Sequence, residues 1–239
     1  MRRSGTLTQR RVLETIYIRA QAQMPRMPQF AGWFALGVIA FAFELAILAI
    51  LHQLLKVPLT IASALAAELV TVGVATLRYQ FPYMEQRRGR PDSPAVATAT
   101  VAAAVRAAWE HAPDLPLFAG GKSFGGRMTS QAAADRLLPG VRGVVFFGFP
   151  LHAPNKPGTK RAEHLKQVTV PMLFLQGTRD TLADLTLLRP ICRDLGPRAT
   201  LHVIETADHS FHVLVKSGKT DGEALRELAQ TTAAWALKI

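Results

Sequence analysis

Residues 120–130, GGKSFGGRMTS, contain two overlapping motifs that imply different folds. Gly121, Lys122 and Ser123 resemble the end of a phosphate-binding loop, but that loop needs a glycine five residues earlier, where this chain has Pro116. Residues 121–125 also match the G-x-S-x-G turn, which places a nucleophilic serine between a strand and a helix. Because proline lacks an N–H and has a fixed φ, we reject the phosphate loop and favour the serine turn.

The sequence around this turn alternates between apolar runs typical of strands and stretches typical of helices. The strands are predicted at 73–81, 115–121, 141–150, 171–177 and 199–205. The helices are predicted at 93–112, 127–138, 182–195 and 220–239. This alternation predicts an α/β fold with a mostly parallel sheet covered by helices.

A serine nucleophile needs a base and an orienting carboxylate, which follow it in the order serine, acid, histidine in this kind of fold. Asp180 comes directly after the apolar run 171–177, and His209 comes after the run 199–205. Both positions lie where a strand ends, at the carboxyl edge of the sheet. We therefore predict Ser123 as nucleophile, His209 as base and Asp180 as acid.

Other residues compete for these roles. Asp184 is the alternative acid, but it falls within the next predicted helix. The alternatives to His209 are His212, three residues further on, and His202, which alternates within a predicted strand and is better explained as structural. His152 follows a strand and is a candidate pocket residue, with a surface histidine as the equal alternative.

Composition narrows the functional class. The chain has 239 residues, is 49% hydrophobic and carries a formal net charge of +11. Its basic groups are not interleaved with aromatic residues that would stack on bases, so we expect no nucleic-acid partner. No His, Cys or carboxylate cluster has metal-ligand spacing and no cofactor is implied, while the single cysteine, Cys192, is predicted to be a passive thiol.

The N-terminal part has a different character. Residues 1–56 are basic and then strongly apolar, and residues 57–239 are predicted as the α/β domain. The apolar block at 30–51 is long enough to span a bilayer, but it is also open to interpretation as additional strands or a fused segment. Residues 57–77 fit either a second span or a helix covering the sheet, and we favour the helix.

Five ordered motifs resemble those of a dienelactone-hydrolase-like branch of the α/β-hydrolases that includes the testis-expressed protein thirty family. They are LRYQFPYMEQ with RPD, GGKSFGGRMTS, FFGFPLHAPNKP, LFLQGTRD and ADHSFHVLVKSGKTD. The resemblance covers about residues 60–239 and implies the same Ser123, Asp180 and His209. The apolar block also resembles, more weakly, the first membrane helices of the GtrA-like family.

The resemblance further implies an oxyanion hole with two N–H donors. One is the N–H of Phe124, directly after the serine. The other comes from a His-Gly-rich loop, and His52 lies near the expected place, but Gln53 and Leu54 stand where glycines are expected. Since glycine lets the backbone approach a ligand closely, this departure puts half of the oxyanion hole in question.

We therefore expect a serine hydrolase that cleaves an ester, thioester or related acyl bond of a small molecule. The alternatives are a non-catalytic interaction protein on the same scaffold, or a membrane-anchored protein with a hydrolase-like cytoplasmic domain. The expected location is the cytoplasm, at the inner face of the membrane if residues 30–51 anchor the chain. Basic residues at 156–166 (Lys156, Lys160, Arg161, Lys166) are better explained as a solvated loop than as a site for an anionic substrate.

Overall fold

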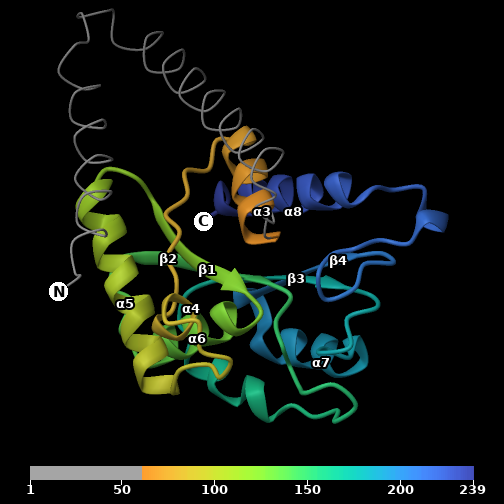
Figure 1. The fold of residues 1–239 in the computed structure, drawn as a ribbon, viewed down its shortest axis with the longest axis horizontal. Coiled ribbons are helices and arrows are strands. Elements are labelled where there is room, and N and C mark those ends of the chain that lie inside the picture. The colour runs from red at the N-terminus through yellow and green to blue at the C-terminus, as the bar shows by residue number, and fades with distance from the viewer. Residues whose placement is uncertain (1–60) are drawn as a thin grey trace, which may run out of the picture. The chain divides into compact units, whose positions relative to one another are not determined.

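The computed structural model of this chain describes residues 61–239 (Figure 1). The calls made on residues 1–56, including the apolar block 30–51 and His52, lie outside the described residues. Within 61–239, none of the helices has both the length and the hydropathy needed to cross a bilayer.

Four parallel strands form the sheet, in the spatial order β1-β2-β3-β4. They are β1 (Leu117–Lys122), β2 (Val141–Phe147), β3 (Met172–Gly177) and β4 (Ala199–Ile204). The register pairs Ala119 of β1 with Val144 of β2, and Phe174 of β3 with Leu201 of β4. Each strand thus lies beside its neighbour in the sequence, and all of their carboxyl ends meet at one edge of the sheet.

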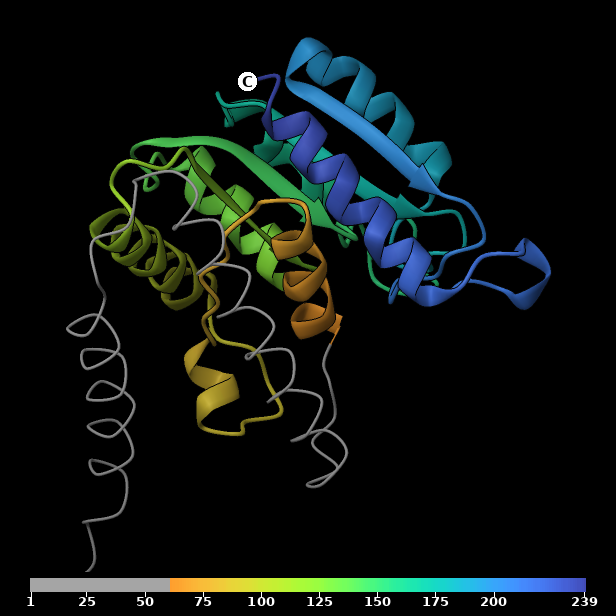
Figure 2. The ribbon, with the colours of Figure 1, turned by 90° about the horizontal axis from the view of Figure 1, so that it is seen from above.

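Helices connect and cover the strands. They are α3 (Ile61–Thr71), α4 (Pro82–Glu85), α5 (Pro94–His111), α6 (Phe124–Ala134), α7 (Leu185–Leu195) and α8 (Asp221–Ala236), with 3₁₀ turns η1 (Lys160–Gln167), η2 (Gly196–Arg198) and η3 (Val215–Ser217). In Figures 1 and 2, α3 and α8 lie over one face of the sheet, and α6 and α7 lie over the other. The predicted strands at 115–121, 141–150, 171–177 and 199–205 and all four predicted helices are present, with ends shifted by a few residues.

The central strands are apolar on both faces because both are covered. In β2, Val145 and Phe147 pack in the cluster that contains α8 residues, whereas Val144 and Phe146 pack in the cluster that contains α7 residues. The same alternation holds in β3, so neither strand presents a polar face to water. A continuous apolar run is the expected sequence of a strand buried on both sides.

Helix ends follow local chemistry. Ser93 caps α5 by accepting a hydrogen bond from the N–H of Val96, and Pro94 occupies the first turn. At α8, Thr220 and Glu223 form a reciprocal capping box. These caps fix where each helix begins relative to the strand before it.

The prediction of a buried strand at 73–81 is wrong. Residues 74–81 form neither a helix nor a strand of the described sheet, and residues 75–80 are exposed. Val74 packs against the core at one end and Phe81 is buried at the other. The apolar pattern is therefore explained by two anchoring contacts and not by strand pairing.

Residues 61–71, the described part of the ambiguous apolar stretch, form α3. This helix packs on α8, and its Leu65 and Leu69 are buried in the core cluster beside the sheet. Arg226 of α8 lies 3.5 Å from the Glu68 carboxylate of α3. The contacts place α3 as a helix that covers the sheet.

Candidate active site

Ser123 occupies a sharp turn between β1 and α6. Its backbone has φ 52° and ψ −116°, a conformation that is costly for a residue with a side chain. The Ser123 N–H donates to the carbonyl of Phe147 at the end of β2, at 3.2 Å. This turn lifts the hydroxyl to the carboxyl edge of the sheet, as the G-x-S-x-G motif predicts.

The glycines around the serine differ in what they make room for. A Cβ on Gly121 would lie 2.9 Å from the backbone of both Gly125 and Gly126, and one on Gly126 would lie 2.6 Å from the Gly121 carbonyl oxygen. A Cβ on Gly125 would meet only the Phe81 ring, at 3.8 Å. The close backbone approach at this turn therefore depends on Gly121 and Gly126, and the motif's second glycine, Gly125, is not crowded.

The structure brings Ser123, His209 and Asp180 together in one hydrogen-bonded chain. The distance from His209 Nε2 to Ser123 Oγ is 2.8 Å, and that from His209 Nδ1 to Asp180 Oδ2 is 2.7 Å. An ionised carboxylate can only accept, so Nδ1 donates to Asp180 and Nε2 is left to accept from the serine hydroxyl. This is the arrangement in which a serine can pass its proton to the imidazole.

The Asp180 side chain is fully buried, and several groups donate hydrogen bonds to it. Its Oδ1 accepts the N–H of Leu182 at 2.8 Å, and its Oδ2 accepts the side-chain amide of Gln176. Sequence reasoning missed Gln176, which is the single polar side chain of the apolar strand β3. A polar residue within such a strand is the signal that could have identified it, because a buried polar group needs a partner.

The competing acid and bases lie elsewhere. Asp184 is the N-cap of α7, where the hydroxyl and N–H of Thr186 donate to it and lower its pKa. His212 is exposed and pairs with Asp221, and the hydrogen bond between them raises the pKa of His212. His202 of β4 pairs with Glu227 of α8 at 2.8 Å.

His152, the predicted pocket or surface residue, is buried and is not among the residues that line the cavity described below. Its Nε2 accepts the N–H of Asp184 at 2.9 Å and its Nδ1 donates to the carbonyl of Ala153 at 3.0 Å. Both ring nitrogens are thus used in joining the loop after β2 to the segment after β3. The neighbouring Pro150 and Ala153 line the cavity described below, and His152 supports the loop that carries them.

Lys122 adds a cation close to the three residues. Burial lowers its pKa to about 8, although Asp180 and Asp208 act in the opposite direction. Its ammonium lies 5.6 Å from the centre of the Phe211 ring. A Cβ placed on Gly148, whose φ is 73°, would lie 3.1 Å from Lys122 Nζ and 3.3 Å from the His209 ring.

The predicted oxyanion donor Phe124 is the first residue of α6. The first N–H groups of a helix have no partner within the helix, so the Phe124 N–H is available beside Ser123. The Phe124 ring packs edge-on against Phe81, at 5.3 Å between ring centres, and against Tyr83 at 6.0 Å. The second predicted donor region, at His52, lies outside the described residues.

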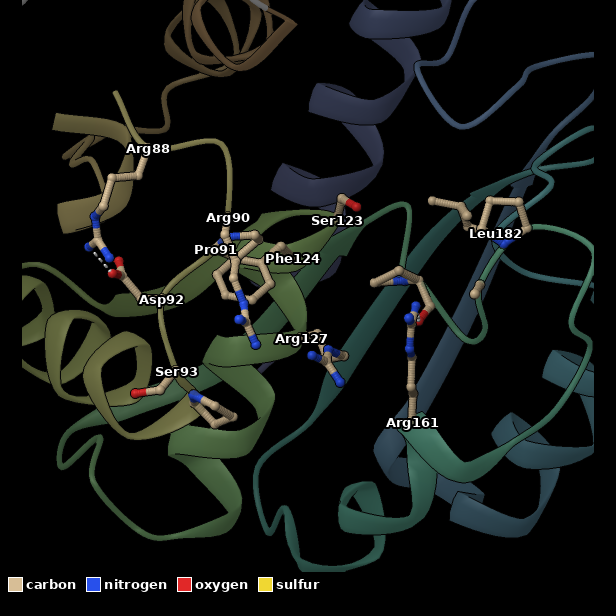
Figure 3. Close-up of a pocket in the computed structure, with 14 residues that line it drawn as sticks. Arg88, Arg90, Pro91, Asp92, Ser93, Ser123, Phe124, Arg127, Arg161 and Leu182 are labelled. Atoms are coloured by element: carbon tan, nitrogen blue, oxygen red, sulfur yellow. Dashed lines mark hydrogen bonds and ion pairs between the residues drawn. The ribbon is translucent and has the colours of Figure 1, made fainter. Parts of the chain in front are cut away.

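A cavity of about 880 Å³ opens beside Ser123 and Phe124. Its other lining residues come from the segment before α5, from α6 and from the loops after β2 and β3 (Figure 3); they are Arg88, Arg90, Pro91, Asp92, Ser93, Pro94, Arg127, Pro150, Ala153, Pro154, Arg161 and Leu182. The candidate nucleophile therefore borders a space large enough for a small organic molecule.

A second serine–histidine hydrogen bond joins α6 to η1. Ser130 Oγ lies 2.7 Å from His164 Nε2 and also donates to the carbonyl of Arg127. Ser130 is fully buried, and burial lowers the pKa of His164. Because no substrate can reach Ser130 without unfolding of α6, this pair is a packing contact between α6 and η1.

The other chemical candidates are inert here. Cys192 is buried on α7, and burial raises its thiol pKa to about 11, which keeps it protonated at neutral pH. Within residues 61–239, no group of His, Cys, Asp and Glu side chains is arranged to hold a metal ion.

The sheet, the serine turn and the hydrogen-bonded chain define an α/β-hydrolase fold. The family described as "Alpha/beta hydrolase domain" matches residues 59–237, so this chain belongs to that family.

Solved structures with the same fold have low sequence identity. A serine hydrolase homologue from Coxiella burnetii is 21% identical, with 73% of this chain and 74% of that chain covered, at a TM-score of 0.57. A serine hydrolase without a lid from Xanthomonas campestris is also 21% identical, with 72% of each chain covered, at 0.54. The esterase domain of a Rhodothermus marinus protein is 16% identical, with 75% of this chain and 80% of that chain covered, at 0.55.

Proposed function

We propose that the protein is a serine hydrolase that cleaves an ester, thioester or related acyl bond through Ser123, His209 and Asp180. The observation that carries the proposal is the continuous hydrogen-bonded chain from Ser123 Oγ through His209 to Asp180. Membership of the alpha/beta hydrolase domain family and the cavity beside Ser123 support it. Placement in the dienelactone-hydrolase-like, testis-expressed protein thirty branch is a narrower proposal, which rests on the sequence motifs.

The reaction has two halves. In the first, His209 Nε2 takes the Ser123 proton, Oγ bonds to the acyl carbon, and the tetrahedral oxyanion forms beside the Phe124 N–H. The protonated His209 then gives its proton to the departing alcohol or thiol, which leaves an acyl-enzyme on Ser123. In the second half, His209 takes a proton from water as the water oxygen bonds to the acyl carbon, and it then returns that proton to Ser123 Oγ as the bond to the serine breaks and the acid product departs.

Asp180 acts on His209 and not on the substrate. It fixes the imidazole with Nε2 toward Ser123, and its negative charge stabilises the imidazolium that forms in each half-reaction. Because the Asp180 side chain is fully buried, this interaction is weakly screened by solvent. The strained backbone at Ser123 keeps the hydroxyl in reach of the imidazole before substrate arrives.

Labelling of the full chain with a fluorophosphonate, together with hydrolysis of 4-nitrophenyl valerate, tests the proposal. We expect the wild-type chain to be labelled and active, and Ser123→Ala and His209→Ala to lose both properties. The matched control is His202→Ala, which removes a histidine paired with Glu227 outside the cavity. A folded wild-type chain that takes up no label would contradict the proposal and favour a non-catalytic role of the scaffold.

A further inference from the structure

Three arginines from separate parts of the chain line the same cavity. Arg90 lies before α5, Arg127 lies on α6 and Arg161 lies on η1, and together they are called the arginine cluster below. In Figure 3 their side chains point into the space below Ser123, whereas Arg88 points away toward Asp92. The basic residues of the predicted solvated loop therefore differ in position. Arg161 lines the cavity, whereas Lys156, Lys160 and Lys166 are exposed outside it.

No carboxylate of residues 61–239 forms an ion pair with the arginine cluster. The lining contains one acidic residue, Asp92, and this carboxylate is already occupied by Arg88 at 2.5 Å and by the N–H of Tyr83 at 2.9 Å. Arg161 donates to the carbonyls of Pro150 and His152, which orient the guanidinium without neutralising it. The cavity wall therefore carries an uncompensated positive charge.

Arg127 and Arg161 also lie near enough to repel one another. Arg127 and Arg161 are both partly buried and line the same cavity, and burial and the charge of Arg161 lower the pKa of Arg127. Like charges held together away from water are unfavourable, and an anion between them removes the cost. Planar guanidinium groups suit the two oxygens of a carboxylate or a phosphate.

Arg127 lies at a defined distance along α6 from the nucleophile. The Arg127 N–H donates to the Ser123 carbonyl at 3.1 Å, so Arg127 is one helical turn after Ser123. Four residues of α-helix rise by about 6 Å, which is the length of a short chain of carbon atoms. A substrate with its acyl carbon at Ser123 would reach the cluster with a group a few bonds away.

We propose that the arginine cluster binds an anionic group, a carboxylate or a phosphate, carried by the acyl substrate a few bonds from the bond that Ser123 attacks. This inference rests on the proposed function and names its substrate class. Arg127 and Arg161 hold the anion, and Arg90 closes the site at the exposed rim of the cavity.

The test compares two esters of equal length on the full chain. The anionic ester is 4-nitrophenyl hydrogen glutarate and the neutral one is 4-nitrophenyl valerate, so the terminal carboxylate is the difference between them. The measured quantity is the ratio of their kcat/KM values in the wild-type chain, in Arg127→Gln and in Arg106→Gln. Arg106 is an exposed residue of α5 outside the cavity, and its variant has the same net charge as Arg127→Gln.

We expect the ratio to fall about 10- to 100-fold in Arg127→Gln, because a charge-assisted hydrogen bond contributes about 1.5–3 kcal/mol. It should stay at the wild-type value in Arg106→Gln. If both esters are hydrolysed through Ser123 and the two variants show the same ratio, the anion site is wrong and the proposed hydrolase function stands.

A binding measurement keeps the inference testable without turnover. Glutarate and inorganic phosphate are each titrated into Ser123→Ala, with and without Arg127→Gln, and the Tm is recorded. A rise in Tm that requires Arg127 supports the site, even if neither ester is hydrolysed and the proposed function falls. The anion with the larger shift identifies the carboxylate or the phosphate as the group, and no shift with either overturns the inference.

Discussion

Gln176 and His209 bind the same carboxylate oxygen of Asp180. The Gln176 amide and the His209 Nδ1–H both donate to Oδ2, and Gln176 Oε1 accepts the N–H of Phe149 at 3.0 Å. Gln176 is fully buried. One amide therefore joins the end of β2 to the acid that orients the histidine.

Replacing Gln176 by leucine should lower both stability and turnover. The variant leaves the buried Phe149 N–H without its acceptor, which costs about 1–3 kcal/mol, and it frees Asp180 to shift relative to His209. We expect kcat for 4-nitrophenyl valerate to fall while KM changes little, because Gln176 does not line the cavity. Urea denaturation and steady-state kinetics measure the two effects.

The matched control is Gln131→Leu on α6, where the side-chain oxygen is buried without a hydrogen-bond partner among the described residues. This variant makes the same chemical change away from Asp180. Equal kcat values for Gln176→Leu and Gln131→Leu would show that Gln176 does not position the acid.

The two glycines of the G-x-S-x-G motif should respond oppositely to alanine. At Gly121 a methyl group would meet backbone atoms 2.9 Å away, so we expect Gly121→Ala to lose about 1–3 kcal/mol of stability. At Gly125 the methyl group has room, and alanine in a helix gains about 0.5–1 kcal/mol over glycine. Thermal denaturation of both variants decides the matter, and a similar loss in each would contradict the crowding that the structure shows.

Lys122 should make stability rise at alkaline pH. The unfolded chain holds the lysine proton up to about pH 10.5, whereas the folded chain releases it near pH 8. Between these values the unfolded state binds more protons, so the free energy of unfolding increases with pH. Urea denaturation of the wild type and Lys122→Met across this range isolates the effect.

The difference in unfolding free energy, wild type minus Lys122→Met, should be level below pH 8 and climb from pH 8 to 10.5. Taking the difference cancels Cys192, whose raised pKa acts on both chains alike. A level difference throughout would mean that the Lys122 ammonium is solvated in the folded protein.

We expect Ser130 to have no role in fluorophosphonate labelling, although its hydroxyl is hydrogen-bonded to His164. Ser130→Ala removes hydrogen bonds to His164 and to the Arg127 carbonyl, so we expect a loss of about 1 kcal/mol of stability. Fluorophosphonate labelling should persist at Ser123, because Ser130 is fully buried. If a folded Ser130→Ala chain is no longer labelled, Ser130 and His164 become the candidate nucleophile and base instead.

Much of the arrangement could be predicted from positions in the sequence. Ser123, Asp180 and His209 each follow an apolar run, and the carboxyl ends of parallel strands share one edge, so order along the chain was enough to place them together. The arginine cluster was not predictable in this way. Arg90, Arg127 and Arg161 lie on a loop, a helix and a 3₁₀ turn, and their convergence depends on side-chain directions that no local pattern encodes.

The segment at 73–81 shows a second reason for failure. Apolar residues there predict a strand, but a strand also requires a neighbouring backbone to accept its hydrogen bonds, and periodicity does not report on that neighbour. In the described fold, Val74 and Phe81 are anchored and the residues between them are exposed. The apolar pattern therefore predicts burial along the whole segment, whereas only Val74 and Phe81, at its ends, pack in the core clusters.

Gly148 limits how the site can diversify among relatives. Its left-handed backbone and its closeness to the His209 ring disfavour any other residue directly after β2. No residue of β2 lines the cavity, so substitutions in this strand do not alter the cavity wall directly. We expect new specificities within this scaffold to come from exposed or partly exposed lining residues of segments 88–94 and 150–161, such as Arg90 and Arg161, while the buried Asp92 and His152 keep the two segments in place.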